Sequence, residues 1–122
     1  MARARPAFEM RETFDPDGTL SLTLVGELDW TFCDDVEARL RGLQDAEWEV
    51  RLDLSQLEFL DSAGVRALLR GLEGARCHGR PVAVGTHVNG SVEQTVTRLG
   101  IGRYLWPEAA HLKEETGQTR GP

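Results

Sequence analysis

The residues best suited to carry chemistry lie in the stretch LEFLDSAGVRALL, residues 57–69. An apolar run stops at Asp61 and Ser62, and apolar residues with helical spacing follow. Ser62 would lie in the first turn of a helix, where unpaired backbone N–H groups and the positive dipole end favour an anion. A phosphate on its hydroxyl would be stabilised there. On spacing alone, however, an Asp–Ser pair is more often an ordinary helix start.

Gly64 occupies the third position of the same expected helix. A glycine there costs on the order of 1 kcal/mol relative to alanine, so a neighbour must need the space. Either another backbone or a partner surface approaches Gly64 closely, or the helix packs tightly on the preceding strand. The sequence leaves both explanations open.

Direct catalysis by Ser62 is disfavoured. A serine hydrolase needs its serine on a GxSxG elbow or beside a positioned histidine, and LDSAG is not that elbow. The histidines, His78, His87 and His111, have no spacing that directs one of them at Ser62. Cys77 and His78 are neighbours on an expected helix and point in different directions, which disfavours shared metal ligation. We expect no enzyme activity, no metal site and no cofactor.

A second distinctive stretch is Gly26-Glu27-Leu28-Asp29, which ends an expected strand with two carboxylates. Spacing alone does not place Asp29 near Ser62. Loops that follow two strands at the same edge of a sheet could nevertheless meet there.

Hydrophobic periodicity predicts the elements that position these stretches, because alternation is typical of half-buried strands and intervals of three and four are typical of helices. The expected strands cover residues 8–14, 19–29, 48–55, 81–85 and 103–107. Three helices are expected, each with one apolar face directed at the core. The residues on these faces are Cys33, Val36, Leu40 and Leu43 in the first helix, Val65, Leu68, Leu69 and Leu72 in the second, and Val92, Val96 and Leu99 in the third.

Turn and cap residues mark the ends of these elements. Residues 15–18, Asp-Pro-Asp-Gly, supply hairpin turn chemistry. The expected helix starts are Thr31 with Asp34 as a capping pair, Asp61 and Asn89. The expected helix ends are Gly79 with Pro81, and Gly100, and a short terminal helix is expected after Pro107.

The resulting order, β-β-α-β-α-β-α-β, predicts an α/β layer fold. Charged residues alternate along residues 48–55, which indicates that one sheet face is lightly covered and that helices gather on the other. A chain of 122 residues fits one domain. We expect it to cover residues 8–112, with fraying termini at 1–7 and 113–122.

Charge and cysteine content exclude several classes. Fourteen Lys and Arg against twenty Asp and Glu give a net charge of −6, which disfavours nucleic acid as a partner. Cys33 and Cys77 lack CxxC or zinc spacing and are expected to be small core residues in a reducing compartment. No apolar run reaches the length of a membrane span, and the N-terminus lacks a signal-peptide pattern. The sequence therefore predicts a cytoplasmic protein without membrane insertion.

Taken together, these motifs resemble the STAS domain family over about residues 19–106. The stretches LVGELDW, VRLDLSQLEFLDSAGVRALLRGLEGARCHGRPVAV and RLGIGRYL follow the order and spacing of that family. The resemblance implies a STAS-like single α/β domain with a mixed central sheet of about five strands and helices mainly on one face.

In stand-alone members, the anti-sigma factor antagonists, a serine of the Asp-Ser-Ser-Gly motif is phosphorylated by a kinase-type anti-sigma factor. By this resemblance Ser62 is the phosphoacceptor, and Asp29 lies beside it. The remaining implied partner-binding residues are Gly26, Glu27, Asp61, Ala63, Gly64 and Arg66. Two departures stand out, because Ala63 replaces the usual second hydroxyl and Phe32 replaces a common threonine, with Thr31 one place early.

The resemblance implies a bacterial partner switch. The unphosphorylated protein would bind the anti-sigma factor serine kinase and free its sigma factor, and a phosphoserine phosphatase would reverse the phosphorylation. ATP would be bound by the partner. The alternative is a STAS module without a switch, either a scaffold or an accessory subunit of a signalling or membrane-transport complex.

Overall fold

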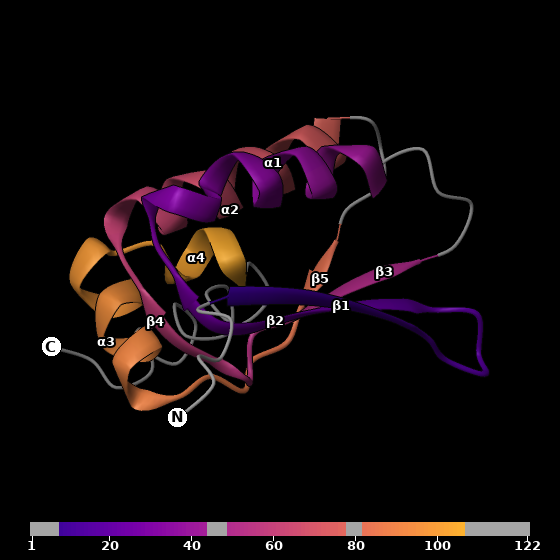
Figure 1. The fold of residues 1–122 in the computed structure, drawn as a ribbon, viewed down its shortest axis with the longest axis horizontal. Helices are drawn as coiled ribbons and strands as arrows, with labels where there is room; N and C mark the ends of the chain where they lie inside the picture. The colour runs from indigo at the N-terminus through magenta and orange to yellow at the C-terminus, as the bar shows by residue number, and fades with distance from the viewer. Residues whose placement is uncertain (1–7, 44–48, 78–81, 107–122) are drawn as a thin grey trace, which may run out of the picture.

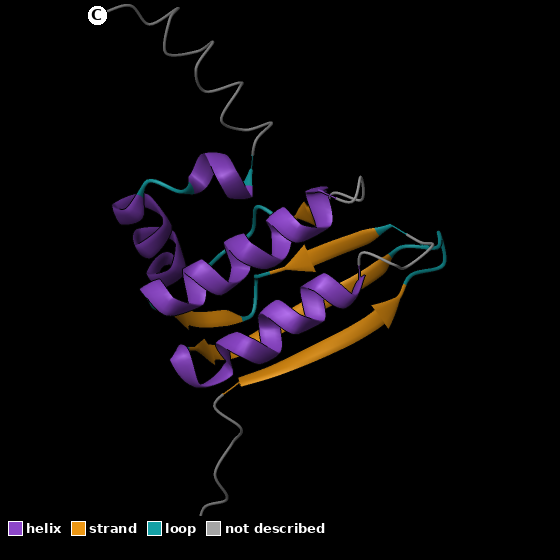
Figure 2. Ribbon diagram, turned by 90° about the horizontal axis from the view of Figure 1, so that it is seen from above, coloured by secondary structure: helices purple, strands orange, loops and turns teal. Residues whose placement is uncertain are grey.

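A mixed five-stranded sheet carries two long helices side by side over one face (Figures 1 and 2). The computed structural model describes residues 8–43, 49–77 and 82–106. The strands are β1 Phe8–Phe14, β2 Leu20–Leu28, β3 Val50–Asp53, β4 Leu57–Leu60 and β5 Ala83–Val84. The helices are the short 3-10 helix η1 Trp30–Phe32, then α1 Cys33–Gly42, α2 Ser62–Cys77, α3 Gly90–Leu99 and α4 Gly102–Leu105.

The sheet is antiparallel only at its first pair. β1 and β2 form the predicted hairpin, whose turn contains Gly18 at φ 90° and a 3.0 Å hydrogen bond from the Thr19 N–H to the Asp17 carboxylate. This hydrogen bond lowers the pKa of Asp17. β3 and β4 follow one another along the other side of β2, both parallel to it, and β5 pairs in parallel with β3.

The core lies between the sheet and the helices. One side chain in two along β2 and β3 is buried under α1 and α2, namely Leu20, Leu22, Leu24, Val50 and Leu52. The intervening side chains face the other way and are polar and partly or fully exposed, namely Ser21, Thr23, Arg51 and Asp53. The predicted fold class, with helices mainly on one face, is therefore confirmed.

The three predicted long helices are present. Val36 and Leu40 of α1 and Val65, Leu68 and Leu72 of α2 are buried, whereas Leu69 is only half-buried. Asn89 caps α3 by accepting the Val92 N–H at 3.1 Å, and Gly100 ends that helix at φ 67°. Leu99 corrects the prediction, because it lies in the last turn of α3 with 44% of its surface exposed.

The fifth strand differs from the prediction. Residues 103–105 belong to the short helix α4, which buries Leu105, and the indole N–H of Trp106 donates to the Gly85 carbonyl at 2.9 Å. The predicted strand at 103–107 is therefore wrong. The fifth strand is β4, within the stretch that precedes Ser62, and its pairing with β2 contains a register shift between Gly26 and Glu27.

Two further predictions need correction. Thr31 does not cap α1, since its own N–H is bound by the Asp29 carboxylate at 2.9 Å and the residue before α1, Phe32, makes no side-chain cap. The cysteines are not core residues either: Cys77 is exposed near the end of α2, and Cys33 is half-buried at the start of α1.

Some predictions fall outside the described residues. They concern the termini, the first residue of the strand expected at 48–55, the helix end at Gly79 and Pro81, and the terminal helix after Pro107. Within 8–43, 49–77 and 82–106, no helix is long and apolar enough to cross a membrane.

Candidate functional site

Parallel pairing brings the two distinctive stretches to one edge of the sheet. β2 ends at Leu28 and β4 ends at Leu60, and these two residues are register partners. The next residue after each strand is therefore an aspartate, Asp29 or Asp61. The Asp61 N–H lies 3.4 Å from the Leu28 carbonyl oxygen, so the two loops touch where the sequence alone could not place them together.

Ser62 is the first residue of α2, and its side chain is exposed. Asp61 caps the helix, because its carboxylate accepts the Gly64 N–H at 2.8 Å and its carbonyl accepts the Val65 N–H at 2.9 Å. Within the described part of the chain, the Ser62 hydroxyl has no hydrogen bond. The arrangement presents a hydroxyl to solvent at the positive end of a helix of 16 residues.

Asp29 organises the neighbouring loop. Its carboxylate accepts the Thr31 N–H at 2.9 Å, and its carbonyl accepts the Phe32 N–H at 3.2 Å and the Cys33 S–H at 3.1 Å. Phe32 in turn packs on Phe8 of β1, with ring centroids 5.1 Å apart. The turn η1 is thus fixed to the strand end on one side and to the core on the other.

The surface around these loops is strongly acidic. Burial raises the pKa of the Cys33 thiol, and the negative charges of Asp61, Asp29, Asp34 and Glu37 raise it further, in that order. Carboxylates from both loops and from α1 therefore act on the same thiol. A further negative group, such as a phosphate on Ser62, would add to the negative charge that these carboxylates already place around the two loops.

Gly64 is explained by packing inside the protein. A Cβ at this position would lie 2.8 Å from Cδ1 of Leu60, 2.9 Å from the Leu28 carbonyl oxygen and 3.0 Å from Cγ of Leu28. The glycine lets α2 approach the ends of β2 and β4. The structure therefore favours the packing explanation over space reserved for a partner.

The other predicted site residues are spread along the same edge. Gly26 has φ 98° and lies at the register shift where β2 changes partner from β3 to β4. Glu27 is exposed and is the register partner of Phe59 on β4. Ala63 is half-buried beside Ser62, and Arg66, one helical turn on, is exposed.

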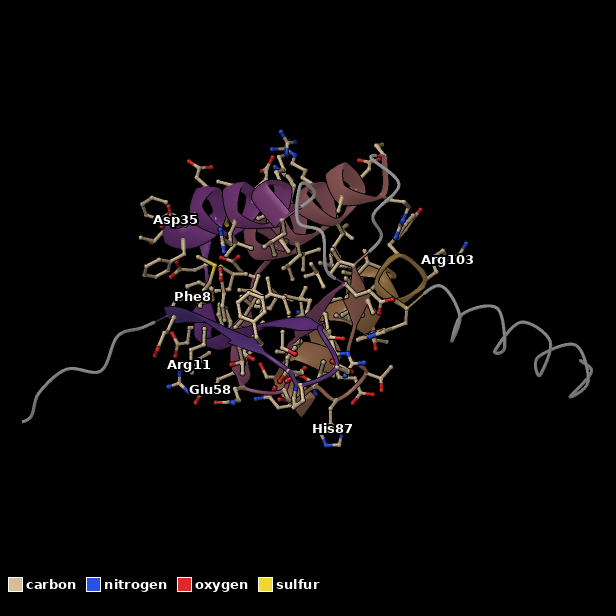
Figure 3. The ribbon with its side chains drawn as sticks, turned by 90° about the vertical axis from the view of Figure 1, so that its right-hand side faces the viewer. Phe8, Arg11, Asp35, Glu58, His87 and Arg103 are labelled. Carbon is tan, nitrogen blue, oxygen red and sulfur yellow. The ribbon has the colours of Figure 1, made fainter. Side chains whose placement is uncertain are left out.

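Sequence reasoning missed an exposed aromatic residue at this edge. Trp30 directly follows Asp29, and 76% of its surface is exposed, the largest value among the large hydrophobic residues that the structure describes. Its position one residue after the Gly-Glu-Leu-Asp stretch was the available signal. Figure 1 shows this edge at the left, where β2 and β4 lead into α1 and α2, and Figure 3 views the molecule from the opposite end, with Asp35 labelled in the helix layer and Phe8 in the sheet below it.

No group of three or more His, Cys, Asp or Glu residues among the described positions could hold a metal ion. A shallow hollow occurs at the far end of α2, lined by Leu69, Leu72, Glu73, Arg76 and Tyr104. It contains neither Ser62 nor Asp29. The surroundings of Ser62 are the loops after β2 and β4 and the start of α2, and Ser62 itself is exposed there.

The Asp61 cap gives a first testable expectation. We expect Asp61→Ala to lower the free energy of unfolding by about 1 kcal/mol, because the Gly64 N–H loses its acceptor. Asp61→Asn keeps an acceptor oxygen and should retain most of the stability. Urea unfolding monitored by circular dichroism measures both, and an Asp61→Ala protein as stable as wild type would contradict the capping role.

Comparison with known proteins decides the family. A family model described as "Mlab, STAS domain" matches residues 13–107, which is well over half of the chain. The chain belongs to the STAS domain family. No curated protein matches this STAS chain significantly.

Solved structures support the same fold for this STAS domain. An anti-sigma factor antagonist from Mycobacterium paratuberculosis is 20% identical, with a TM-score of 0.65 over 82% of this chain and 83% of that one. SpoIIAA in its unphosphorylated form is 17% identical, with a TM-score of 0.64 over 89% and 97%. An antisigma-factor antagonist STAS domain from Rhodobacter sphaeroides is 22% identical, with a TM-score of 0.52 over 73% and 91%. At these identities the likeness concerns the fold.

Proposed function

We propose that this STAS domain is an anti-sigma factor antagonist. In its unphosphorylated form it binds a kinase-type anti-sigma factor and so frees the sigma factor. The partner transfers phosphate from its own ATP to the Ser62 hydroxyl, and phosphorylation ends the binding. A phosphoserine phosphatase removes the phosphate, and the protein itself has no catalytic residue. The cytoplasm is the compartment in which these partners would meet it.

The observation that carries this proposal is the exposed Ser62 at the start of α2, beside the loop of Asp29. A phosphoacceptor must reach the active site of a second protein, and an exposed hydroxyl that makes no hydrogen bond within the described residues meets that requirement. The structural neighbours named as anti-sigma factor antagonists share the fold that builds this edge.

The acidic surroundings provide the physical basis for the switch. Phosphate adds about −1.5 to −2 charges at neutral pH. At Ser62 this charge would lie near Asp61 and Asp29, whose carboxylates are held in place by hydrogen bonds to Gly64 and Thr31. A partner surface fitted to the neutral hydroxyl would then meet bulk and concentrated negative charge.

Phosphate transfer in vitro tests the proposal. Each small ATP-binding kinase of the histidine-kinase type from the source genome is incubated with the protein and ATP, and the product is examined by intact mass and peptide mapping. We expect one kinase to add a single phosphate, on Ser62, and Ser62→Ala to abolish the transfer.

Ser91 supplies a matched control for that experiment. It is an exposed serine in the first turn of α3, which is capped by Asn89 as α2 is capped by Asp61. Ser91→Ala should therefore leave labelling unchanged. Labelling that persists in Ser62→Ala and disappears in Ser91→Ala would show that Ser91 is the phosphoacceptor, and it would contradict the proposal for Ser62.

A STAS module without a switch is the second candidate, as a scaffold or as an accessory subunit of a signalling or membrane-transport complex. Two observations favour it: the matching family model is described by the Mlab STAS domain, and Ala63 stands beside Ser62 in place of a second hydroxyl. A neighbouring gene for a small ATP-binding kinase favours the switch, whereas neighbouring transporter genes favour the subunit.

A further inference from the structure

We propose that Trp30 is the anchor residue through which the unphosphorylated protein docks its kinase partner, and that the partner presents an apolar pocket within a basic surface. This inference rests on the proposed function and adds the contact that supplies the affinity. It concerns a residue that no motif of the sequence assigned to the site.

Exposure is the first observation. Trp30 keeps 76% of its surface accessible in a chain whose core otherwise takes up most of its large apolar side chains. Indoles are enriched at protein interfaces because they combine a large apolar area with an N–H donor. Covering such a side chain on binding removes apolar area from water that folding left exposed.

The second observation is that hydrogen bonds and packing hold the backbone on both sides of Trp30 in place. The two flanking residues are fixed: the Asp29 carboxylate accepts the Thr31 N–H at 2.9 Å, and the Asp29 carbonyl accepts the Cys33 S–H at 3.1 Å. Phe32, the last residue of the turn, packs on Phe8. Little backbone order remains to be gained on binding, and an anchor held in advance costs less conformational entropy.

The third observation is position. The turn η1 contacts α2, the helix that begins with Ser62. Cys33 follows the turn directly, and after burial the negative charge of Asp61 in the other loop is the next largest cause of its raised thiol pKa. A partner that reaches the Ser62 hydroxyl therefore covers the turn that carries Trp30, so one interface includes the anchor and the switch.

Charge determines the chemistry of the partner. The residues near the turn include the acidic side chains of Asp29, Asp34, Asp35 and Asp61, while Arg66 is the cation on the first turns of α2. A complementary surface is basic, and such pairing speeds association and fixes orientation. The structure thus points to a basic rim around an apolar pocket that receives the indole.

Calorimetric titration of the kinase that labels Ser62 with unphosphorylated wild type and Trp30→Ala tests the anchor. We expect Trp30→Ala to weaken binding by about thirtyfold, the size typical of an interface hot spot. Tyr104→Ala is the matched control: Tyr104 is 53% exposed, but it lies beside Arg76, about 20 Å along α2 from Ser62. That variant should bind like wild type.

Fluorine NMR of fluorotryptophan-labelled wild type gives a second readout that does not depend on the stability of a variant. The chain has three tryptophans, Trp30, Trp48 and Trp106, and Trp30→Phe assigns the Trp30 resonance. We expect this resonance to shift on adding the kinase and to return after Ser62 is phosphorylated.

Distinct results separate the anchor from the switch. A kinase that labels Ser62 and binds Trp30→Ala within about threefold of wild type, with an unmoved Trp30 resonance, overturns the anchor and leaves the proposed function intact. If no host kinase binds or labels the protein, both the proposed function and the anchor are overturned.

Discussion

Ser62→Asp should weaken binding to the kinase partner at least about tenfold, equivalent to about 1.4 kcal/mol. The substitution adds a full negative charge at the start of α2, near the carboxylates of Asp61 and Asp29, which hydrogen bonds to Gly64 and Thr31 hold in place. Juxtaposed like charges across an interface cost several kcal/mol, and a carboxylate carries less charge than a phosphate. Authentic phosphoserine should therefore weaken binding further than aspartate does.

The fold should tolerate this change. An acidic residue in the first turn of a helix is favoured by the dipole by about 0.3–1 kcal/mol, which offsets repulsion from the neighbouring carboxylates. We expect the thermal midpoint of Ser62→Asp to stay near that of wild type. A loss of binding without a loss of stability then identifies an interface effect.

Two matched variants complete this comparison. Ser62→Ala keeps the site neutral and should bind like unphosphorylated wild type while being unable to switch. Ser91→Asp places the same charge in the first turn of α3, away from Asp29, and should leave the affinity unchanged. Equal calorimetric affinity of wild type and Ser62→Asp would count heavily against the charge mechanism.

Gly71→Ala should destabilise the protein substantially through a single added methyl group. Gly71 lies where α2 crosses α1, and a Cβ there would be 2.6 Å from Cβ and 2.7 Å from Cδ1 of the buried Leu40. Because the Cβ of Leu40 is fixed to its backbone, rotation of that side chain cannot clear the contact. The two helices must separate, and we expect a net cost of about 2 kcal/mol.

Gly42→Ala is the control for that substitution. Gly42 is the last residue of α1, and nothing lies within 4 Å of the position its Cβ would take. Alanine there should be neutral or should stabilise the protein by up to about 1 kcal/mol, because it favours the helix. Urea unfolding resolves the two variants, and a Gly71→Ala protein as stable as Gly42→Ala would refute close α1–α2 packing.

Periodicity predicted the parts of the fold whose burial follows a regular pattern. Leu20, Leu22 and Leu24 alternate in the sequence and are buried under the helices. The stripe of α2 repeats every three or four residues and is buried at Val65, Leu68 and Leu72. In these elements one face meets one core, so the sequence pattern and the fold carry the same information.

Short elements were missed where tertiary contacts override the pattern. β4 buries Leu57 and Leu60, three positions apart, because it is brief and a register shift interrupts its pairing with β2. Its burial therefore lacks the period of two. Residues 103–106 include Tyr104 and Trp106, residue types that favour strands, but burial of Leu105 and the hydrogen bond from Trp106 to Gly85 fix a single helical turn.

The candidate site was predictable in its residues but not in its geometry. Asp61 and Asp29 could be singled out from their stretches, yet their proximity depends on the pairing of Leu28 with Leu60, which the sequence does not encode locally. Trp30 escaped notice because exposure is a property of the folded surface. The choice between the two explanations of Gly64 also required the fold, because the Leu28 carbonyl oxygen that would contact its Cβ belongs to a distant part of the sequence.

The most direct test of the switch is the intact mass of the protein purified from its own host across growth conditions. The switch predicts two populations, one unmodified and one carrying a single phosphate that peptide mapping locates at Ser62. Absence of that phosphate under every condition, together with no labelling by any host kinase, would contradict the switch and leave a STAS scaffold or accessory subunit.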